Sequence, residues 1–224
     1  MGQMIEFADG AHDAYLAVPE SGGGPGVLVI QEWWGLVDHV KDLADRFAEA
    51  GFVALAPDLY EGETTKAPDQ AGKLMMALNI GKTAEKLGSA VDALVAHGAT
   101  KGDKVGAVGF CMGGQLALFA ATTDERIGAC VDFYGIHPNV EPDLSKLAGP
   151  VVGFFAEKDG FVDLAAVTKL MQAMGEAGAR FEVHRYLDTD HAFMNDTRPE
   201  VFHAEHAREA WDITTRFLHA QLGA

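Results

Sequence analysis

A single cysteine, Cys111, lies where the sequence changes from an apolar, β-branched run to a helix-forming run. Val105–Phe110 is typical of a buried strand, and Met112–Leu118 is typical of a helix. Between these runs, Gly109, Cys111 and Gly113 form a G-x-C-x-G turn. The glycines let the strand and the helix approach closely, and the residue at the apex takes a strained conformation. A thiol held at such an apex can act as a nucleophile.

The sequence around Cys111 favours a reactive thiol. The thiolate is the nucleophilic form, and the positive end of a helix that begins near Met112 would stabilise it. A nearby histidine would take the proton. The alternative is a small core residue, because unpaired cysteines are among the most buried residue types. A catalytic role therefore requires a base and an orienting acid elsewhere in the chain.

The G-x-C-x-G turn resembles the nucleophile elbow of α/β hydrolases, in which nucleophile, acid and histidine follow in that order along the chain. The acid should follow the second strand beyond the elbow. Val151–Ala156 is that strand, and Asp159 is the best acid after it. Nearby, Glu157 is expected to cap the strand end and Asp163 to cap the next helix. A simple turn residue before Gly160 is the alternative interpretation of Asp159.

The histidine should lie in a loop after the last strand, Phe181–Tyr186, and His191 lies there. The other histidines fall within expected strands or helices, except His137, which lies in a loop and is the only rival. His203 and His206 are three residues apart on a helix and could share a metal ion. With no carboxylate or cysteine set nearby, a solvated helix face is the better interpretation, and no metal or cofactor is expected.

The elements that must position these residues alternate between strands and helices. Asp9 and Gly10 separate two short runs, which indicates an initial hairpin. The expected strands are Gln3–Phe7, His12–Val18, Gly26–Ile30, Phe52–Ala56, the run from Val105, Ile127–Phe133, Val151–Ala156 and Phe181–Tyr186. This order predicts an α/β fold in one domain spanning residues 1–224. Its sheet is mostly parallel, with helices on both faces and an N-terminal hairpin.

Apolar stripes at helical spacing predict the inner faces of the helices between these strands. The stripes are Val40, Leu43, Ala44 and Phe47; Leu87, Ala90, Val91, Leu94 and Val95; Leu164, Val167, Leu170, Met171 and Met174; and, within a C-terminal helix Glu200–Leu222, Ala207, Trp211, Thr214 and Leu218. Glu61–Asp69 is expected to be a polar loop, with a short helix at Leu74–Leu78. Cys130 is expected to be a core residue.

Composition excludes several classes of partner. The chain has 224 residues, and its formal net charge is −16. No cluster of Lys and Arg can neutralise phosphates, so nucleic acid and an anionic membrane surface are both disfavoured. Two cysteines, no secretory leader and no long apolar run favour a reducing, cytoplasmic setting. The expected partner is a small molecule, bound by a monomer or a small homo-oligomer.

Three segments together resemble the dienelactone hydrolase (carboxymethylenebutenolidase) family of α/β hydrolases. They are Gln31–Gly35 (QEWWG), Gly109–Gly114 (GFCMGG) and Asp190–Phe193 (DHAF), in the family's order and at similar spacing. The combination is specific, because most α/β hydrolases use serine and lack the glutamate after the first buried strand. The resemblance implies the α/β-hydrolase fold and an enzyme that hydrolyses carboxylic esters or lactones.

The resemblance also implies roles for the residues that match these motifs. Cys111 would be the nucleophile, His191 the base and Asp159 the acid that orients the base. Glu32 matches the family's glutamate, which interacts with the cysteine and helps control its protonation.

The backbone N–H groups of Trp33 and Met112 match the family's oxyanion hole, which stabilises charge on the carbonyl oxygen. Further residues are expected to bind the substrate: Trp34, Tyr60, Phe193 and Arg198. For Trp34, ordinary core packing is the alternative to lining the acyl pocket.

The chain departs from the family where a substrate carboxylate would bind. Family members that act in chloroaromatic degradation hold that group with two arginines. No arginine lies within Glu61–Leu78, and Asn195 stands where the second arginine would follow the histidine. Arg198, Lys66 or Lys73 could substitute, although a lysine does not reproduce a bidentate arginine. The resemblance therefore supports the family's hydrolase chemistry for this chain more strongly than it supports the family's substrate.

Two classes of function follow from these observations. The first is a hydrolase that forms an acyl-enzyme on Cys111. The second is a non-hydrolytic protein on the same fold, which binds a ligand or senses oxidants through the thiol. The complete order of cysteine, acid and histidine favours the hydrolase, because a binding protein needs no such set.

Overall fold

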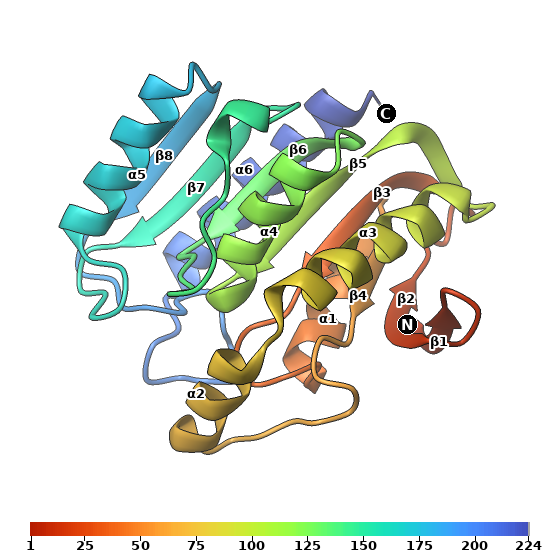
Figure 1. Ribbon diagram of the computed structural model, residues 1–224, viewed down its shortest axis with the longest axis horizontal. Coiled ribbons are helices and arrows are strands. Elements are labelled where there is room, and N and C mark those ends of the chain that lie inside the picture. The colour runs from red at the N-terminus through yellow and green to blue at the C-terminus, as the bar shows by residue number, and fades with distance from the viewer. Residues whose placement is uncertain (224) are drawn as a thin grey trace.

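The computed structural model describes residues 1–223 and has one eight-stranded sheet at its centre, in the order β1-β2-β4-β3-β5-β6-β7-β8 (Figure 1). The pairs β1–β2 and β2–β4 are antiparallel, and all other neighbouring pairs are parallel. The predicted hairpin and the mostly parallel sheet are therefore confirmed. The strands are β1 (Gln3–Phe7), β2 (His12–Ala17), β3 (Gly24–Ile30), β4 (Val53–Pro57), β5 (Thr100–Phe110), β6 (Ile127–Phe133), β7 (Val151–Ala156) and β8 (Phe181–Tyr186).

Helices cover both faces of this sheet. They are α1 (Asp38–Glu49), α2 (Pro68–Ala77), α3 (Ile80–Ala96), α4 (Met112–Thr123), α5 (Leu164–Glu176) and α6 (Ala204–Leu222), with a short 3₁₀ turn at Leu144–Lys146. In Figure 1, α3, α4 and α5 lie in front of the sheet, and α1 and α6 lie behind it. Among residues 1–223, no helix combines the length and the apolar character that crossing a membrane requires.

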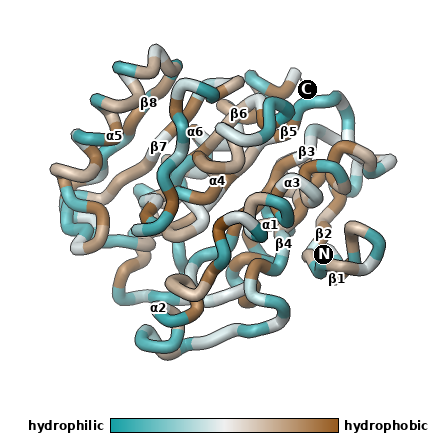
Figure 2. Tube along the Cα trace, in the orientation of Figure 1, coloured by the Kyte–Doolittle hydropathy of each residue, from teal (hydrophilic) through white to brown (hydrophobic). Residues whose placement is uncertain are grey.

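The central strands are apolar throughout because both of their faces are covered. In β3, Val27 and Val29 pack into the cluster under α1 and α6, while Leu28 and Ile30 pack into the cluster under α3 and α4. In Figure 2 the middle of the sheet is mostly brown and pale, and teal residues lie mainly in the helices and loops around it. Two-sided burial explains why these strands lack the alternation of a half-exposed strand.

Several predicted boundaries differ from the structure near helix ends. α2 begins at Pro68, so the expected loop Glu61–Asp69 ends earlier and the expected helix Leu74–Leu78 is longer. Proline favours this start. The N–H of the first helical residue has no acceptor within a helix, so a proline, which lacks an N–H, loses no hydrogen bond there. α6 begins at Ala204 rather than Glu200, because His203 caps it by accepting from the His206 N–H.

The inner face predicted for α5 is wrong in part. Leu164 and Met171 are 56% and 40% exposed, and Val167 and Met174 are the buried positions. α5 lies over β7 and β8 at the edge of the sheet, so it buries a narrow stripe. The apolar pattern alone overestimated the width of that stripe.

Candidate active site

The turn at Cys111 joins β5, in the middle of the sheet, to α4. Cys111 has φ 54° and ψ −120°, a strained conformation for a residue with a side chain. Its N–H donates to the Phe133 carbonyl at 2.9 Å, and its own carbonyl accepts from the Ile136 N–H at 3.1 Å. The end of β6 and the loop that follows it therefore hold the strained residue on both sides.

Two glycines of the turn are required by close backbone approach. A Cβ at Gly109 would collide with the Gly113 carbonyl, and a Cβ at Gly113 would collide with the carbonyls of Ile30 and Gln31. These contacts press the start of α4 against β5 and the end of β3. As a result, the segment that follows β3 lies beside the elbow.

His191 and Asp159 lie together, as the strand order predicted. His191 Nδ1 is 2.6 Å from Asp159 Oδ2. The buried Asp159 carboxylate also accepts, at Oδ1, from the backbone N–H groups of Phe161 at 2.7 Å and Val162 at 2.9 Å. Both carboxylate oxygens are engaged, so the orientation of the carboxylate is fixed. The rival, His137, instead accepts at Nδ1 from the Asn139 N–H.

The Cys111 thiol lies close enough to His191 to raise the pKa of the imidazole. Burial lowers the pKa of His191, but the negative charge of Cys111 and the hydrogen bond and charge of Asp159 outweigh it and raise the pKa well above its ordinary value. Nδ1 is engaged by Asp159. Nε2 is buried and has no partner other than the Cys111 thiol within residues 1–223, so it is the nitrogen available to the thiol proton.

Two aromatic rings flank the His191 imidazole. The Tyr134 ring lies 4.9 Å away on the buried side, and the Phe161 ring lies 5.1 Å away on the exposed side. Burial and the charges of Glu32 and Cys111 raise the pKa of Tyr134, so its phenol lies among the acidic groups of the site. Sequence reasoning missed both rings. Phe161 follows Asp159 by two positions, which is the only signal that could have marked it.

Glu32 is held by a residue from the far end of the chain. It is 1% exposed, and its Oε2 accepts from Asn195 Nδ2 at 2.8 Å. The orientation of that amide is fixed, because Asn195 Oδ1 accepts from the N–H and the hydroxyl of Thr197. Glu32 Oε1 is buried and has no partner in the described part of the chain. Asn195 thus holds the carboxylate without adding a charge.

The two backbone N–H groups expected to form an oxyanion hole are free of backbone partners. Met112 is the first residue of α4, so its N–H has no acceptor within the helix. Trp33 follows β3, and its N–H donates to no backbone carbonyl within residues 1–223. Both donors remain available to a ligand.

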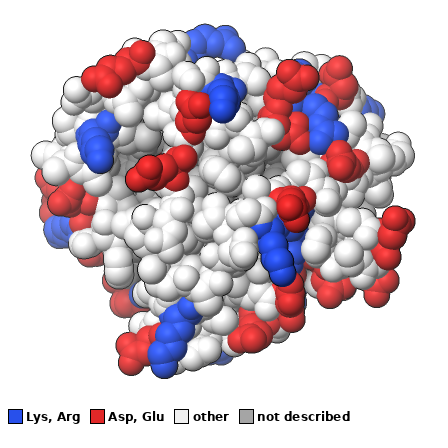
Figure 3. Space-filling model, in the orientation of Figure 1, with Lys and Arg blue, Asp and Glu red and all other residues white. Residues whose placement is uncertain are grey.

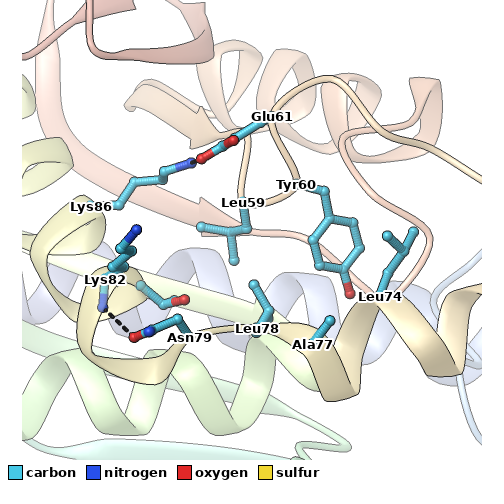
Figure 4. Close-up of a pocket in the computed structure, with 10 residues that line it drawn as sticks. Leu59, Tyr60, Glu61, Leu74, Ala77, Leu78, Asn79, Lys82 and Lys86 are labelled. Atoms are coloured by element: carbon cyan, nitrogen blue, oxygen red, sulfur yellow. Dashed lines mark hydrogen bonds and ion pairs between the residues drawn. The ribbon is translucent and has the colours of Figure 1, made fainter.

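Tyr60 links the elbow to a hollow of about 220 Å³ between the end of β4, α2 and α3 (Figure 4). Its hydroxyl donates to Met112 Sδ at 3.2 Å. Burial, and next the charge of Cys111, raise the pKa of Tyr60. The figure shows its ring beside Leu74 and Ala77, at the opposite end of the hollow from Lys82. Tyr60 therefore lies between this hollow and the cysteine.

The remaining predicted substrate residues separate into two groups. Trp34 and Arg198 line a second hollow of about 570 Å³, with the Arg198 guanidinium 5.6 Å from the Trp34 ring centre. Asn195 lines the same hollow. Phe193 has no exposed surface, and its ring lies 5.4 Å from Tyr134. We therefore correct the assignment of Phe193 from the substrate pocket to the core beneath His191.

Comparison with known proteins identifies relatives along the whole chain. The sequence pattern of the dienelactone hydrolase family matches residues 12–222. Protein usf of Aquifex pyrophilus is 38% identical over 231 residues, which cover 99% of this chain and 100% of that protein. A candidate carboxymethylenebutenolidase of Aquifex aeolicus is 35% identical over the same coverage. A solved structure of a candidate dienelactone hydrolase from Klebsiella pneumoniae has a TM-score of 0.88 at 26% identity, covering 97% of this chain and 98% of that one.

Proposed function

The chain belongs to the dienelactone hydrolase family of α/β hydrolases, and on that premise we propose that it hydrolyses a small carboxylic ester or lactone through an acyl-enzyme on Cys111. One observation carries the proposal: a strained cysteine at the end of β5 lies beside an imidazole whose other nitrogen is bonded to a buried carboxylate. That arrangement is the general form of an activated nucleophile.

The proposed reaction has two steps. The thiol proton passes to His191 Nε2, and the Cys111 sulfur attacks the carbonyl carbon. The N–H groups of Trp33 and Met112 stabilise the negative oxygen of the intermediate. The intermediate then collapses to a thioester, and the alcohol leaves with the proton from His191. A water molecule then gives a proton to Nε2 and attacks the thioester carbon. The C–S bond breaks, the acid leaves, and His191 returns the proton to the Cys111 sulfur, which restores the thiol.

Glu32 has a proposed role in controlling the thiol proton. Its charge and that of Cys111 both raise the pKa of Tyr134, which indicates that both groups lie near the same phenol. Two negative charges close together repel each other, so the Glu32 carboxylate would act through its charge on the Cys111 sulfur.

The surface charge is consistent with a small substrate. On the face shown in Figure 3, Lys and Arg side chains lie singly among Asp and Glu, without a large basic patch. A polyanion would find no extended binding surface on this face.

The test measures hydrolysis of short p-nitrophenyl esters and of dienelactone by the wild type and by Cys111→Ala and His191→Ala. We expect each variant to lose several orders of magnitude in kcat. Cys130→Ala is the matched control, because Cys130 is buried in β6 and has no proposed role. Equal rates in wild type and Cys111→Ala would remove Cys111 from the mechanism.

Mass spectrometry of the quenched reaction separates this proposal from a thiol sensor. The hydrolase should show an acyl group on Cys111 that disappears as substrate is consumed. A stable sulfenic acid on Cys111 in a protein without esterase activity would support the sensor instead.

A further inference from the structure

Phe161 is an exposed aromatic residue that the proposed mechanism does not use. It is 58% exposed, yet its ring lies 5.1 Å from the His191 ring and 6.0 Å from the Trp33 ring. Met171 on α5 is a second exposed apolar side chain, at 40%. Phe161 therefore presents apolar surface to solvent at the place where a substrate would reach His191.

The position of this ring is fixed by the same carboxylate that holds the imidazole. Asp159 bonds His191 through Oδ2 and accepts from the Phe161 N–H through Oδ1 at 2.7 Å. The next residue, Val162, is buried with Phe155 and Val167 in a small apolar cluster, which anchors the loop. The backbone of Phe161 is thus held by the Asp159 carboxylate, and the neighbouring Val162 packs into the core.

The proposed chemistry indicates which part of a substrate meets this ring. His191 must give its proton to the leaving alcohol, so the alcohol part lies beside the imidazole. The carbonyl oxygen lies toward the Trp33 N–H. The exposed edge of the imidazole is flanked by Phe161, whereas the other flank is closed by the fully buried Tyr134.

We propose that Phe161 and Trp33 form an apolar binding surface for the alcohol part of the substrate. The enzyme then prefers esters whose ester oxygen carries an apolar alkyl or aryl group, and lactones whose ring is apolar at that position. This inference rests on the proposed function, because it uses the role of His191 in releasing the alcohol.

The experiment compares ethyl, butyl and hexyl acetate, whose acyl groups are identical and whose alcohols have similar acidity. Differences between these esters therefore report contacts of the alkyl chain rather than leaving-group chemistry. We expect kcat/KM of the wild type to rise roughly tenfold from ethyl to hexyl acetate, as partial burial of the added methylenes implies. In Phe161→Ser the rise should disappear, mainly through a higher KM for hexyl acetate.

Two further variants define the result. Phe161→Tyr keeps an aromatic face and should retain most of the rise. Met171→Ser removes an exposed apolar side chain from α5, outside the loop that carries Phe161, and should leave the rates on all three esters unchanged.

The outcomes that overturn the inference are distinct from those that overturn the proposed function. Hydrolysis of all three acetates without a size dependence, or an equal loss on all three in Phe161→Ser, removes the alcohol-binding role and leaves the hydrolase intact. Failure of the wild type to hydrolyse any ester overturns the proposed function, and the inference with it.

Discussion

The two carboxylates that flank the cysteine are held in different ways. Asp159, after β7, has both oxygens engaged, one by His191 and the other by two backbone N–H groups. Glu32, after β3, has one oxygen bonded to Asn195 and the other buried without a partner. A fully bonded carboxylate is fixed in orientation, whereas a half-bonded one retains acceptor capacity inside a dry site.

This difference separates two tasks within one site. In the proposed mechanism, Asp159 would set the tautomer and the plane of the imidazole. In the same mechanism, Glu32 would supply a charge near the thiol, and its Oε1 would be free to interact as the reaction proceeds. A substitution that preserves shape but changes hydrogen bonding should therefore have unequal effects on the two sides.

The largest expected effect is on the Asp159 side. In Asp159→Asn, the Phe161 and Val162 N–H groups keep the amide oxygen where Oδ1 lies, so the amide NH₂ faces His191 Nδ1. The imidazole must then carry its proton on Nε2 and cannot accept the thiol proton. We expect kcat to fall about 10⁴-fold with little change in stability, as for a wrong tautomer in other triads.

The matched control for this change is Asp163→Asn, four residues along the same loop. Asp163 caps α5 by accepting from the Ala166 N–H, and asparagine is an equally good cap. It should leave kcat unchanged. If Asp159→Asn retained more than a tenth of the activity, orientation by Asp159 would not be needed.

The Asp159 side could be predicted from the sequence because its signals are local. Asp159 and His191 each follow a strand within a few residues, and parallel strands bring their carboxyl ends to one edge of the sheet. The glycines of the elbow are a local signal of the same kind, because they predict the sharp turn between β5 and α4. The strand boundaries of β1, β6, β7 and β8 were also predicted, since abrupt changes from apolar to turn residues mark them.

The Glu32 side could not be predicted in the same way. The hydrogen bond from Asn195 joins residues 163 positions apart, and it depends on the turn that Thr197 stabilises. The sequence identified Asn195 only as a departure from the family. The core position of Phe193 and the exposure of Leu164 were missed for a related reason: apolar character predicts burial without saying which surface a side chain contacts.

A third carboxylate extends the comparison, because Asp132 beneath the elbow is 1% exposed and no side chain within residues 1–223 bonds either of its oxygens. Burial raises its pKa to about 7, and the Gly135 N–H partly opposes this shift. The folded-state pKa lies above the unfolded value of about 4, so folding favours the protonated form. The contribution of Asp132 to the free energy of unfolding is therefore fully present below pH 4 and is lost as pH rises through 7.

Asp132→Asn should remove this loss, because an amide of the same shape does not ionise. At pH 8 we expect a higher free energy of unfolding than in the wild type, by at most about 4 kcal/mol, the equivalent of three pKa units. Urea unfolding at pH 4 and pH 8 measures it. Asp13→Asn, on the exposed face of β2, makes the same charge change and should shift neither value. A variant less stable than the wild type at pH 8 would show that the Asp132 charge stabilises the elbow.

The smallest expected effect is on Asn195, and it tests whether this residue acts only through Glu32. Asn195→Ala leaves the Glu32 carboxylate buried without a hydrogen bond, and we expect kcat/KM to fall roughly tenfold, the size of one hydrogen bond to a charged group. In Glu32→Gln that charge is absent, so adding Asn195→Ala should cost little more. Additive losses in the double variant would instead give Asn195 a role of its own at the second hollow, and the two sides of the elbow would then differ in more than the bonding of their carboxylates.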